Sequence, residues 1–288
     1  MRTPQAVSAL ALAAALLVGV AFAAPTLAPD ETVIRATVPA GPGLFNSAKQ
    51  IDVTVFKPKG EGPFPIAVIS HGSPRSAAER RRGGRVRFEA QSRAFMAMGY
   101  AVVVPTRRGY GDSEGDWAEG YGTCSAPDYY AAGLESARDI LAATDAARAI
   151  PGLDGKRIVL VGQSAGAFGS VAAATKPVPG LMAVVNFAGG RGSRGPDDVC
   201  AEAQLVEAMA RYGKGTHVPQ LWIYSRNDRF FGPDLARRMH AAYQAGGGSA
   251  QFVEAPAAGL DGHGYFATSM DDWSPRVEDF LARIGAKR

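Results

Sequence analysis

Cysteine and histidine are scarce in this sequence, which holds two cysteines and four histidines among 288 residues. No group of histidines lies near either cysteine, so the sequence predicts no zinc site, and we expect no metal or organic cofactor. A surplus of one charge is also missing, because the formal net charge is only +4. We therefore expect no nucleic-acid partner, and we predict a solvated surface for the one basic cluster, which lacks interleaved aromatics: Arg80, Arg81, Arg82, Arg85, Arg87 and Arg93.

Charged residues are absent from one long stretch near the start of the chain. Residues 6–23 follow Arg2 without a single charge and end in Ala21-Phe22-Ala23. A short basic start, an apolar centre and an A-x-A ending are typical of a secretory signal peptide, so we predict cleavage after Ala23. An uncleaved anchor is the alternative, but the alanine-rich run is of marginal spanning length. We expect a secreted or periplasmic protein with no stable membrane anchor.

The two cysteines, Cys124 and Cys200, belong to a chain that is predicted to be exported. An even number of cysteines in an oxidising compartment favours a disulfide bond, with two free thiols as the alternative. Such a bond would join two loops that we expect near the entrance of the substrate site.

Internal repeats, low-complexity tracts and interdomain linkers are absent, so residues 24–288 are predicted to form a single domain. Apolar strand patterns alternate with helical patterns along the chain, which indicates a mostly parallel sheet that begins with antiparallel strands. The expected strands are 31–38, 51–57, 66–69, 101–104, 157–161, 181–187, 220–224 and 251–254. The expected helices are 88–98, 129–150, the segment after Ser164, 199–212, 233–245 and 274–284.

The segment Gly162-Gln163-Ser164-Ala165-Gly166 lies between a strand pattern and a run of small residues suited to a closely packed helix. A serine on such a sharp turn has a strained backbone, and the glycines two positions away on either side make room for it. The hydroxyl of Ser164 then projects from the sheet as a candidate nucleophile. The N–H of Ala165, at the start of the helix, can stabilise an oxyanion.

Ligands of a parallel sheet bind at the carboxyl ends of its strands. Besides Ser164, the segments that follow predicted strands include Ser70-His71-Gly72-Ser73-Pro74, Tyr224-Ser225-Arg226-Asn227-Asp228 and Asp261-Gly262-His263-Gly264-Tyr265-Phe266. The chain order is therefore serine, aspartate, histidine, all expected at one edge of the sheet. In the first of these segments, the N–H of Ser73 is the candidate second oxyanion donor, because Gly72 permits the turn and Pro74 has no N–H.

These motifs, with the loop from Arg107 to Gly115, resemble the α/β-hydrolase superfamily over the whole chain after residue 23. Within it, the sequence is similar to dienelactone-hydrolase-like serine esterases and related peptidases, although dienelactone hydrolase itself has a cysteine nucleophile. The resemblance implies the α/β-hydrolase fold, with a sheet of about eight strands and helices on both faces. It implies that Ser164 is the nucleophile, His263 the general base and Asp228 the acid that orients His263. Asp261 is the alternative acid, but it lies too close to His263 in sequence to reach the far ring nitrogen easily.

Several side chains are expected in the substrate pocket: His71, Tyr110, Trp117, Tyr121 and Gln163. Arg107 and Arg108 are predicted to pair with the acidic residues of their own loop, Asp112 and Glu114, and to fix it, with an anion clamp for the substrate as the alternative.

The segment 189–219 is too short for a large lid, which favours small, soluble substrates. We expect a serine hydrolase that cleaves carboxylic esters of small molecules through a Ser164 acyl-enzyme. A serine peptidase of the dipeptidyl or acylaminoacyl type is the runner-up, since such enzymes usually carry an additional domain, and a non-catalytic binding protein on the same fold is the third candidate. The sequence does not fix the oligomeric state.

Overall fold

A computed structural model of the chain describes residues 28–41 and 47–286. The predicted signal peptide, residues 1–23, lies outside the described residues.

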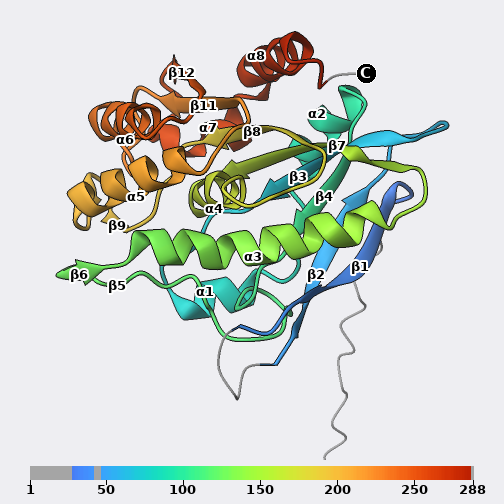
Figure 1. The fold of residues 1–288 in the computed structure, drawn as a ribbon, viewed down its shortest axis with the longest axis horizontal. Helices are drawn as coiled ribbons and strands as arrows, with labels where there is room; N and C mark the ends of the chain where they lie inside the picture. Colours follow the sequence, from blue (N-terminus) through green and yellow to red (C-terminus); the bar gives the residue numbers. More distant parts are fainter. Residues whose placement is uncertain (1–27, 42–46, 287–288) are drawn as a thin grey trace, which may run out of the picture.

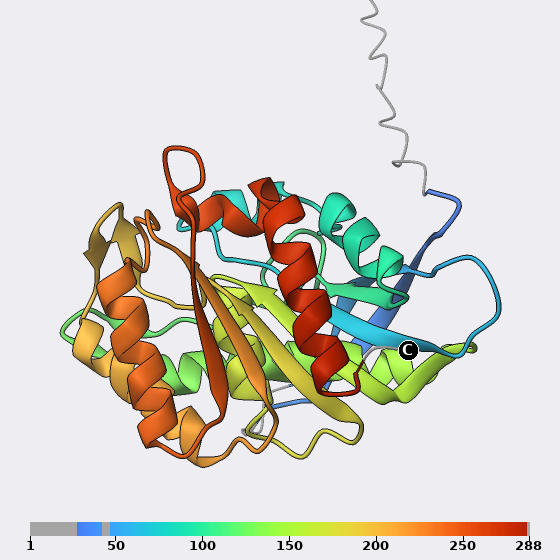
Figure 2. The ribbon, with the colours of Figure 1, turned by 90° about the horizontal axis from the view of Figure 1, so that it is seen from above.

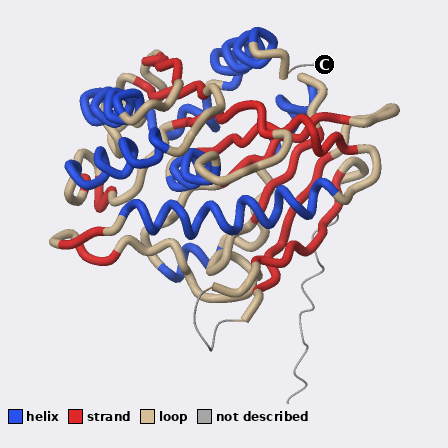
Figure 3. The backbone as a smooth tube through the Cα atoms, viewed as in Figure 1, coloured by secondary structure: helices blue, strands red, loops and turns tan. Residues whose placement is uncertain are grey.

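The strands form one twisted sheet through the middle of the molecule (Figures 1 and 3). Its order is β1-β2-β4-β3-β7-β8-β11-β12. The first two pairs, β1 with β2 and β2 with β4, are antiparallel, and all the others are parallel. The strands are β1 Glu31–Val38, β2 Lys49–Phe56, β3 Phe64–Ser70, β4 Ala101–Pro105, β7 Leu153–Gln163, β8 Leu181–Phe187, β11 Gln220–Ser225 and β12 Ala250–Ala255. The predicted α/β-hydrolase sheet, with its antiparallel start, is confirmed.

Helices cover both faces of the sheet, as Figure 2 shows from above. One face carries α3 Tyr129–Arg148, α4 Ala165–Ala173, α5 Glu202–Lys214 and α6 Pro233–Ala245. The other carries α2 Glu89–Ala97, α7 Tyr265–Thr268 and α8 Met270–Arg283. The helix predicted over 199–212 begins only at Glu202, because Asp198 and Val199 form β10, which pairs with β9 Ser193–Gly195.

The continuous apolar runs of the central strands are explained by these two helical layers. Along β3, Ile66 and Val68 pack into the core of one face, whereas Ala67 and Ile69 pack into the core of the other. Successive side chains of a strand point to opposite faces, so a strand covered on both sides must be apolar at every position.

A disulfide bond joins Cys124 to Cys200, with the two Cα atoms 5.3 Å apart, so the predicted bridge is confirmed. Cys124 lies in the turn between β5 Gly122–Thr123 and β6 Ala126–Pro127, and Cys200 follows β10. The bond thus joins two small hairpins that are distant in sequence. Among the residues that the structure describes, none of the helices is both long and apolar enough to span a bilayer.

The prediction of a solvated arginine cluster is wrong for part of it. Arg85 and Arg87 pair with the buried carboxylate of Glu31, at 2.6 and 2.5 Å. Arg80 belongs to the short helix α1 Ala77–Arg82 and is 9% exposed. Sequence reasoning missed these contacts because each depends on where β1 and α1 lie in the folded chain.

Candidate active site

Ser164 occupies the turn between β7 and α4 and has a backbone that few residues adopt, with φ 58° and ψ −126°. Gly162 and Gly166, two positions away on either side, have no room for a side chain. A Cβ atom on Gly162 would lie 2.4 Å from the backbone nitrogen of Ala167, and one on Gly166 would lie 2.1 Å from the carbonyl oxygen of Ser70. Any side chain at either position would force the turn apart, so the G-x-S-x-G spacing follows from the close packing of β3, β7 and α4.

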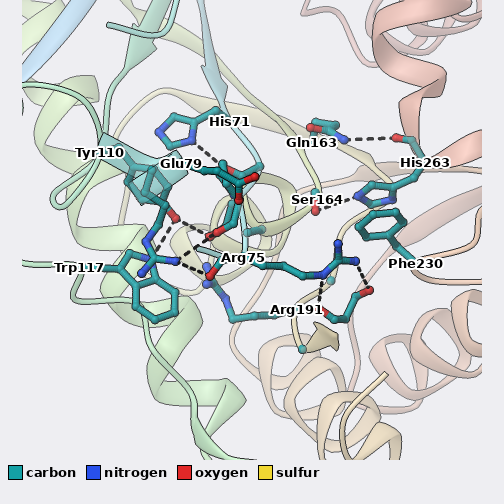
Figure 4. A pocket seen from close by; sticks show the side chains of 18 of the residues that line it. His71, Arg75, Glu79, Tyr110, Trp117, Gln163, Ser164, Arg191, Phe230 and His263 are labelled. Carbon is teal, nitrogen blue, oxygen red and sulfur yellow. Dashed lines mark hydrogen bonds between the residues drawn. The ribbon is translucent and has the colours of Figure 1, made fainter. Parts of the chain in front are cut away.

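The structure brings Ser164, His263 and Asp228 together, although they come from three separate loops. The Nε2 atom of His263 lies 3.0 Å from Ser164 Oγ, and its Nδ1 atom lies 3.1 Å from Asp228 Oδ2 (Figure 4 draws the first pair). The imidazole can therefore accept the hydroxyl proton on one side while a carboxylate receives its N–H on the other.

Asp228 is held in place by its own loop. Its side chain is fully buried, and its Oδ1 atom accepts hydrogen bonds from the backbone N–H groups of Phe230 and Phe231, at 2.7 and 2.9 Å. Asp261, the alternative acid, instead accepts the backbone N–H groups of Arg229 and His263, both at 3.0 Å. Asp261 thus fixes the histidine loop and makes no hydrogen bond to the imidazole.

Two aromatic side chains that sequence reasoning missed hold the ring of His263. Phe230 stacks on the imidazole with ring centroids 4.1 Å apart, and Phe231 meets it edge-on at 5.5 Å. Gln163, the residue before Ser164, donates a hydrogen bond to the backbone carbonyl of His263 at 3.2 Å. A local feature of the sequence could have indicated the two phenylalanines. Asp228 accepts the backbone N–H groups of the residues two and three positions later, and this turn brings Phe230 and Phe231 next to His263, which Asp228 contacts.

His71 lies in the turn after β3 and has a different environment. Burial, together with the charge of Arg107, lowers its pKa to about 3. The neutral ring donates through Nδ1 to the carbonyl of Gly72 at 2.7 Å and accepts the N–H of Arg107 through Nε2 at 3.2 Å. Both ring nitrogens are used, so His71 fixes the turn and has no lone pair left for Ser164.

The bond from His71 orients the peptide group between Gly72 and Ser73. The C=O and N–H of a trans peptide point in opposite directions, so holding the Gly72 carbonyl against His71 turns the N–H of Ser73 away from that ring. Ser73 and Ser164 both line the same pocket. The N–H of Ala165, the first residue of α4, is a helix N-terminal donor without an intrahelical carbonyl partner. Two backbone donors therefore lie on the turns that flank Ser164.

The pocket at Ser164 has a volume of about 690 Å³. All five residues expected to line a substrate pocket are in its wall: His71, Tyr110, Trp117, Tyr121 and Gln163. Figure 4 shows His263 and Phe230 on one side of Ser164 and Tyr110 and Trp117 on the other. Tyr121 belongs to the segment that the disulfide bond joins to β10, so that bond stabilises one part of the wall.

A buried ionic cluster supports the wall behind Tyr110. Arg107 pairs with Glu119 at 2.8 Å, and Arg191 approaches the same carboxylate at 3.3 Å. Burial opposes ionisation of Glu119, but the two guanidinium groups hold its pKa well below the usual range. The Tyr110 hydroxyl also donates to Glu119, and burial with that neighbouring charge raises the pKa of Tyr110 to about 12. The phenol therefore stays protonated.

The predicted pairing within the loop 107–114 is wrong, although its structural role is right. Arg108 pairs with Asp139 of α3 at 2.6 Å, and Glu114 accepts the N–H of Gln50 at 2.9 Å. Sequence reasoning missed Arg191, although it follows the carboxyl end of β8, where ligands of a parallel sheet bind. No sequence pattern indicated Glu119, because Arg107 and Arg191, its partners, lie close to it only in the folded chain.

The arrangement can carry out acyl transfer: a hydroxyl is next to an imidazole, the imidazole is next to a carboxylate, and Ser73 and Ala165, the candidate N–H donors, line the same pocket. Within residues 28–41 and 47–286, no three His, Cys, Asp or Glu side chains are grouped so that they could hold a metal ion.

Comparison with known sequences gives one family. The profile of the X-Pro dipeptidyl-peptidase (S15 family) matches residues 48–242, which include Ser164 and Asp228 and end before His263. No curated protein sequence matches the chain.

Solved structures of several hydrolases share the fold. The Pyrococcus horikoshii acylaminoacyl peptidase is similar with a TM-score of 0.63 and 19% identity over 89% of this chain and 42% of the peptidase. A puromycin-hydrolyzing peptidase from Mycobacterium tuberculosis is similar with a TM-score of 0.56 and 19% identity, over 90% of this chain and 40% of that one. The Pyrococcus furiosus esterase Pf2001 is similar with a TM-score of 0.59 and 16% identity, over 88% of this chain and 92% of the esterase. This chain thus spans less than half of the two peptidases and most of the esterase.

Proposed function

The chain belongs to the X-Pro dipeptidyl-peptidase (S15) family and is a serine hydrolase of the α/β-hydrolase type, and on this premise we propose that it cleaves carboxylic esters of small molecules. The observation that carries the proposal is the contact of Ser164 Oγ with His263 Nε2, at 3.0 Å, on the wall of an open pocket.

In the proposed first step, Ser164 Oγ attacks the ester carbonyl carbon and its proton passes to His263 Nε2. The charge that develops on the carbonyl oxygen is stabilised by the N–H groups of Ser73 and Ala165. When the intermediate collapses, the carbon–oxygen bond to the alcohol breaks and His263 returns the proton to the departing oxygen. The product of this step is an acyl-enzyme on Ser164.

In the second step a water molecule attacks the acyl carbon and loses a proton to His263. The bond from carbon to Ser164 Oγ breaks, the serine regains its proton from the imidazole, and the carboxylic acid leaves. Asp228 stabilises the imidazolium of His263 in both steps and keeps its ring in the tautomer that presents Nε2 to Ser164.

The charge of the pocket favours an ester over a substrate with a free amino terminus. A peptidase that releases short amino-terminal peptides needs an acceptor for the substrate's ammonium group. Among the pocket-lining residues that the structure describes, Glu79 is the one carboxylate, and it accepts hydrogen bonds from the hydroxyl and N–H of Ser76. The other charged residues of the lining are arginines.

A serine peptidase is the second candidate. It is favoured by the family match and by the likeness to an acylaminoacyl peptidase, whose substrates by its name carry a blocked amino terminus. A peptide with a blocked amino terminus carries no ammonium group and would not need a carboxylate in the pocket to bind it. The likeness to dienelactone-hydrolase-like esterases rests on the sequence motifs alone.

We also propose that the chain is exported. The disulfide between Cys124 and Cys200 supports an oxidising compartment, and the residues before 24 have the pattern of a signal peptide.

Amide substrates decide between the two candidates, because serine peptidases also hydrolyse activated esters. We would measure kcat/KM for 4-nitrophenyl esters of increasing chain length, for an alanyl-prolyl 4-nitroanilide and for an N-acetyl-alanyl 4-nitroanilide. We expect turnover of short esters and little or no turnover of either anilide. Turnover of an anilide with a kcat/KM equal to that of the best ester would replace ester hydrolysis by the peptidase function.

A further inference from the structure

Positive charge dominates the wall of the pocket. Its charged lining residues are Arg75, Arg80, Arg191, Arg194 and Glu79. Two of these arginines lie near a carboxylate: Arg191 lies 3.3 Å from Glu119, which also pairs with Arg107, and Arg194 lies 2.6 Å from Asp198. The remaining two, Arg75 and Arg80, form no ion pair among the described residues.

Arg80 is nine-tenths buried and has no carboxylate partner among the described residues. Its Nη1 atom donates to the backbone carbonyls of Pro74 and Arg75, at 3.1 and 2.9 Å. Its guanidinium lies 3.9 Å above the ring of Trp117, whose Nε1 donates to the Tyr110 hydroxyl at 3.0 Å. The stacked guanidinium is therefore held rigidly, and Nε and Nη2 remain for a ligand.

Glu79, the carboxylate of the lining, does not neutralise Arg80. Its hydrogen bonds go to Ser76, and these bonds, followed by the charges of Arg82 and Arg75, lower its pKa. Behind the wall, one carboxylate, Glu119, serves two guanidinium groups, Arg107 and Arg191. The lining residues therefore carry more positive than negative charge, and Glu119 behind them does not fully offset Arg191 because it also pairs with Arg107.

A buried guanidinium without a counter-ion is costly, and a planar fork of N–H groups on an aromatic face suits a carboxylate. We propose that Arg80 and Trp117 form a carboxylate subsite, which binds an acidic group on the acyl part of the substrate. This inference rests on the proposed ester hydrolysis and names the class of ester: half-esters of dicarboxylic acids and their relatives.

The assignment to the acyl part follows from the position of His263. The histidine protonates the departing alcohol, so the alcohol must lie on its side of Ser164. Figure 4 shows Trp117 across the pocket from His263, with Ser164 between them. An acyl chain that extends away from His263 thus runs toward Trp117 and the guanidinium stacked on it.

Arg75 lies at the exposed edge of the pocket and adds to its positive electrostatic potential. Its Nε and Nη2 atoms donate to the carbonyl and hydroxyl of Ser193, both at 3.1 Å, and its guanidinium lies 4.6 Å from the ring centroid of Phe230. Because this side chain is exposed and already bonded, we expect it to attract an acid rather than to bind it directly.

Matched esters test the subsite on the unmodified protein. We would compare kcat/KM for the mono-4-nitrophenyl esters of adipic, pimelic and suberic acids with their ω-amide counterparts, which have the same length and no charge. A charge-assisted hydrogen bond predicts a preference for the acid of about ten- to a hundredfold at one or more of these lengths.

Arg80→Gln should reduce that ratio to less than about threefold, because the neutral amide cannot replace the guanidinium fork. Arg82→Gln is the matched control: Arg82 lies on the same helix, is exposed and does not line the pocket, so the ratio should stay unchanged. Should Arg80→Gln fail to fold, Arg75→Gln at the exposed rim should still lower the ratio, by about two- to fivefold.

Calorimetric titration with adipate separates this inference from the proposed function. Adipate should bind the wild-type protein and bind Arg80→Gln at least about tenfold more weakly. Hydrolysis of the acid and amide esters at equal rates, with no adipate binding, would overturn the subsite and leave ester hydrolysis standing. Adipate binding that depends on Arg80, without turnover of any ester, would support the subsite and contradict the proposed function.

Discussion

Two histidines face one pocket from opposite sides of Ser164, and their surroundings differ in nearly every respect (Figure 4). His263 is partly exposed, stacks on Phe230 and lies between a buried carboxylate and a serine hydroxyl. His71 is 5% exposed and lies near Arg107, and its ring makes hydrogen bonds only to backbone groups.

The difference shows that the partners of an imidazole decide its role. A carboxylate beside His263 stabilises the charged ring that proton transfer requires. Burial and the positive charge beside His71 stabilise the neutral ring, which suits a fixed hydrogen-bond donor and acceptor. One histidine is thus suited to move a proton and the other to orient a peptide group.

We expect the largest loss of activity when His263, rather than His71, is replaced. His263→Gln should lower kcat for an activated ester by about 10⁴-fold or more, because no base then receives the proton of Ser164. Steady-state kinetics on the purified variant measures this, with a melting curve to show that it folds. A variant that kept kcat within tenfold of the wild type would remove His263 from the mechanism.

Asp228 and Asp261, the two carboxylates near His263, are expected to differ in the same way. Asp228→Asn should lower kcat by up to about 10⁴-fold, since the amide favours the wrong tautomer of His263. Asp261→Asn should change kcat by less than about tenfold, because an amide oxygen can still accept the two backbone N–H groups. Kinetics of the two variants side by side tests the assignment of the acid. If Asp261→Asn were the more damaging change, the roles of the two carboxylates would be reversed.

A smaller effect is expected at the other histidine. His71→Asn keeps a donor near the carbonyl of Gly72 but loses the acceptor for the N–H of Arg107, so the oxyanion-binding peptide should be held less rigidly. We expect kcat to fall by about ten- to a hundredfold with little change in KM. A purely structural role would lower the melting temperature and leave kcat per folded molecule unchanged, which would contradict the account.

The stability of the protein should depend on pH through His71. The folded state holds its pKa at about 3, whereas the unfolded chain has the ordinary value near 6.5, so only the unfolded state takes up the proton as pH falls between these values. The free energy of unfolding should therefore drop by about 2 kcal/mol from pH 7 to pH 5 on account of this residue. Urea unfolding at both pH values should show a smaller drop for His71→Asn, and an identical drop in both proteins would contradict a neutral, buried His71.

Much of the fold could be predicted because the signals are local. The helix Pro233–Ala245 and the strand Leu181–Phe187 were predicted with the bounds that the structure has. Continuous apolar runs identify strands that are covered on both faces, and the rule that sites gather at the carboxyl ends of parallel strands points to Ser164, Asp228 and His263.

The charged wall of the pocket could not be predicted in the same way. Arg80 lies in an arginine-rich segment that suggests solvent exposure, and only the packing of α1 against Trp117 buries it. Arg108 bonds to a carboxylate 31 residues away in sequence, and Glu119 bonds to Arg191, in a loop that follows another strand. Side chains paired across loops leave no periodic pattern, so a single sequence does not reveal the pairs.

We propose that His263 activates Ser164 for attack on a carbonyl carbon. Reaction with a fluorophosphonate probe, followed by peptide mass spectrometry, tests it most directly, since the probe modifies serines that an adjacent base has activated. We predict labelling of Ser164 in the wild-type protein, slower labelling by orders of magnitude in His263→Gln, and none in Ser164→Ala. A wild-type protein that stayed unlabelled, or that was labelled as fast without His263, would contradict the account.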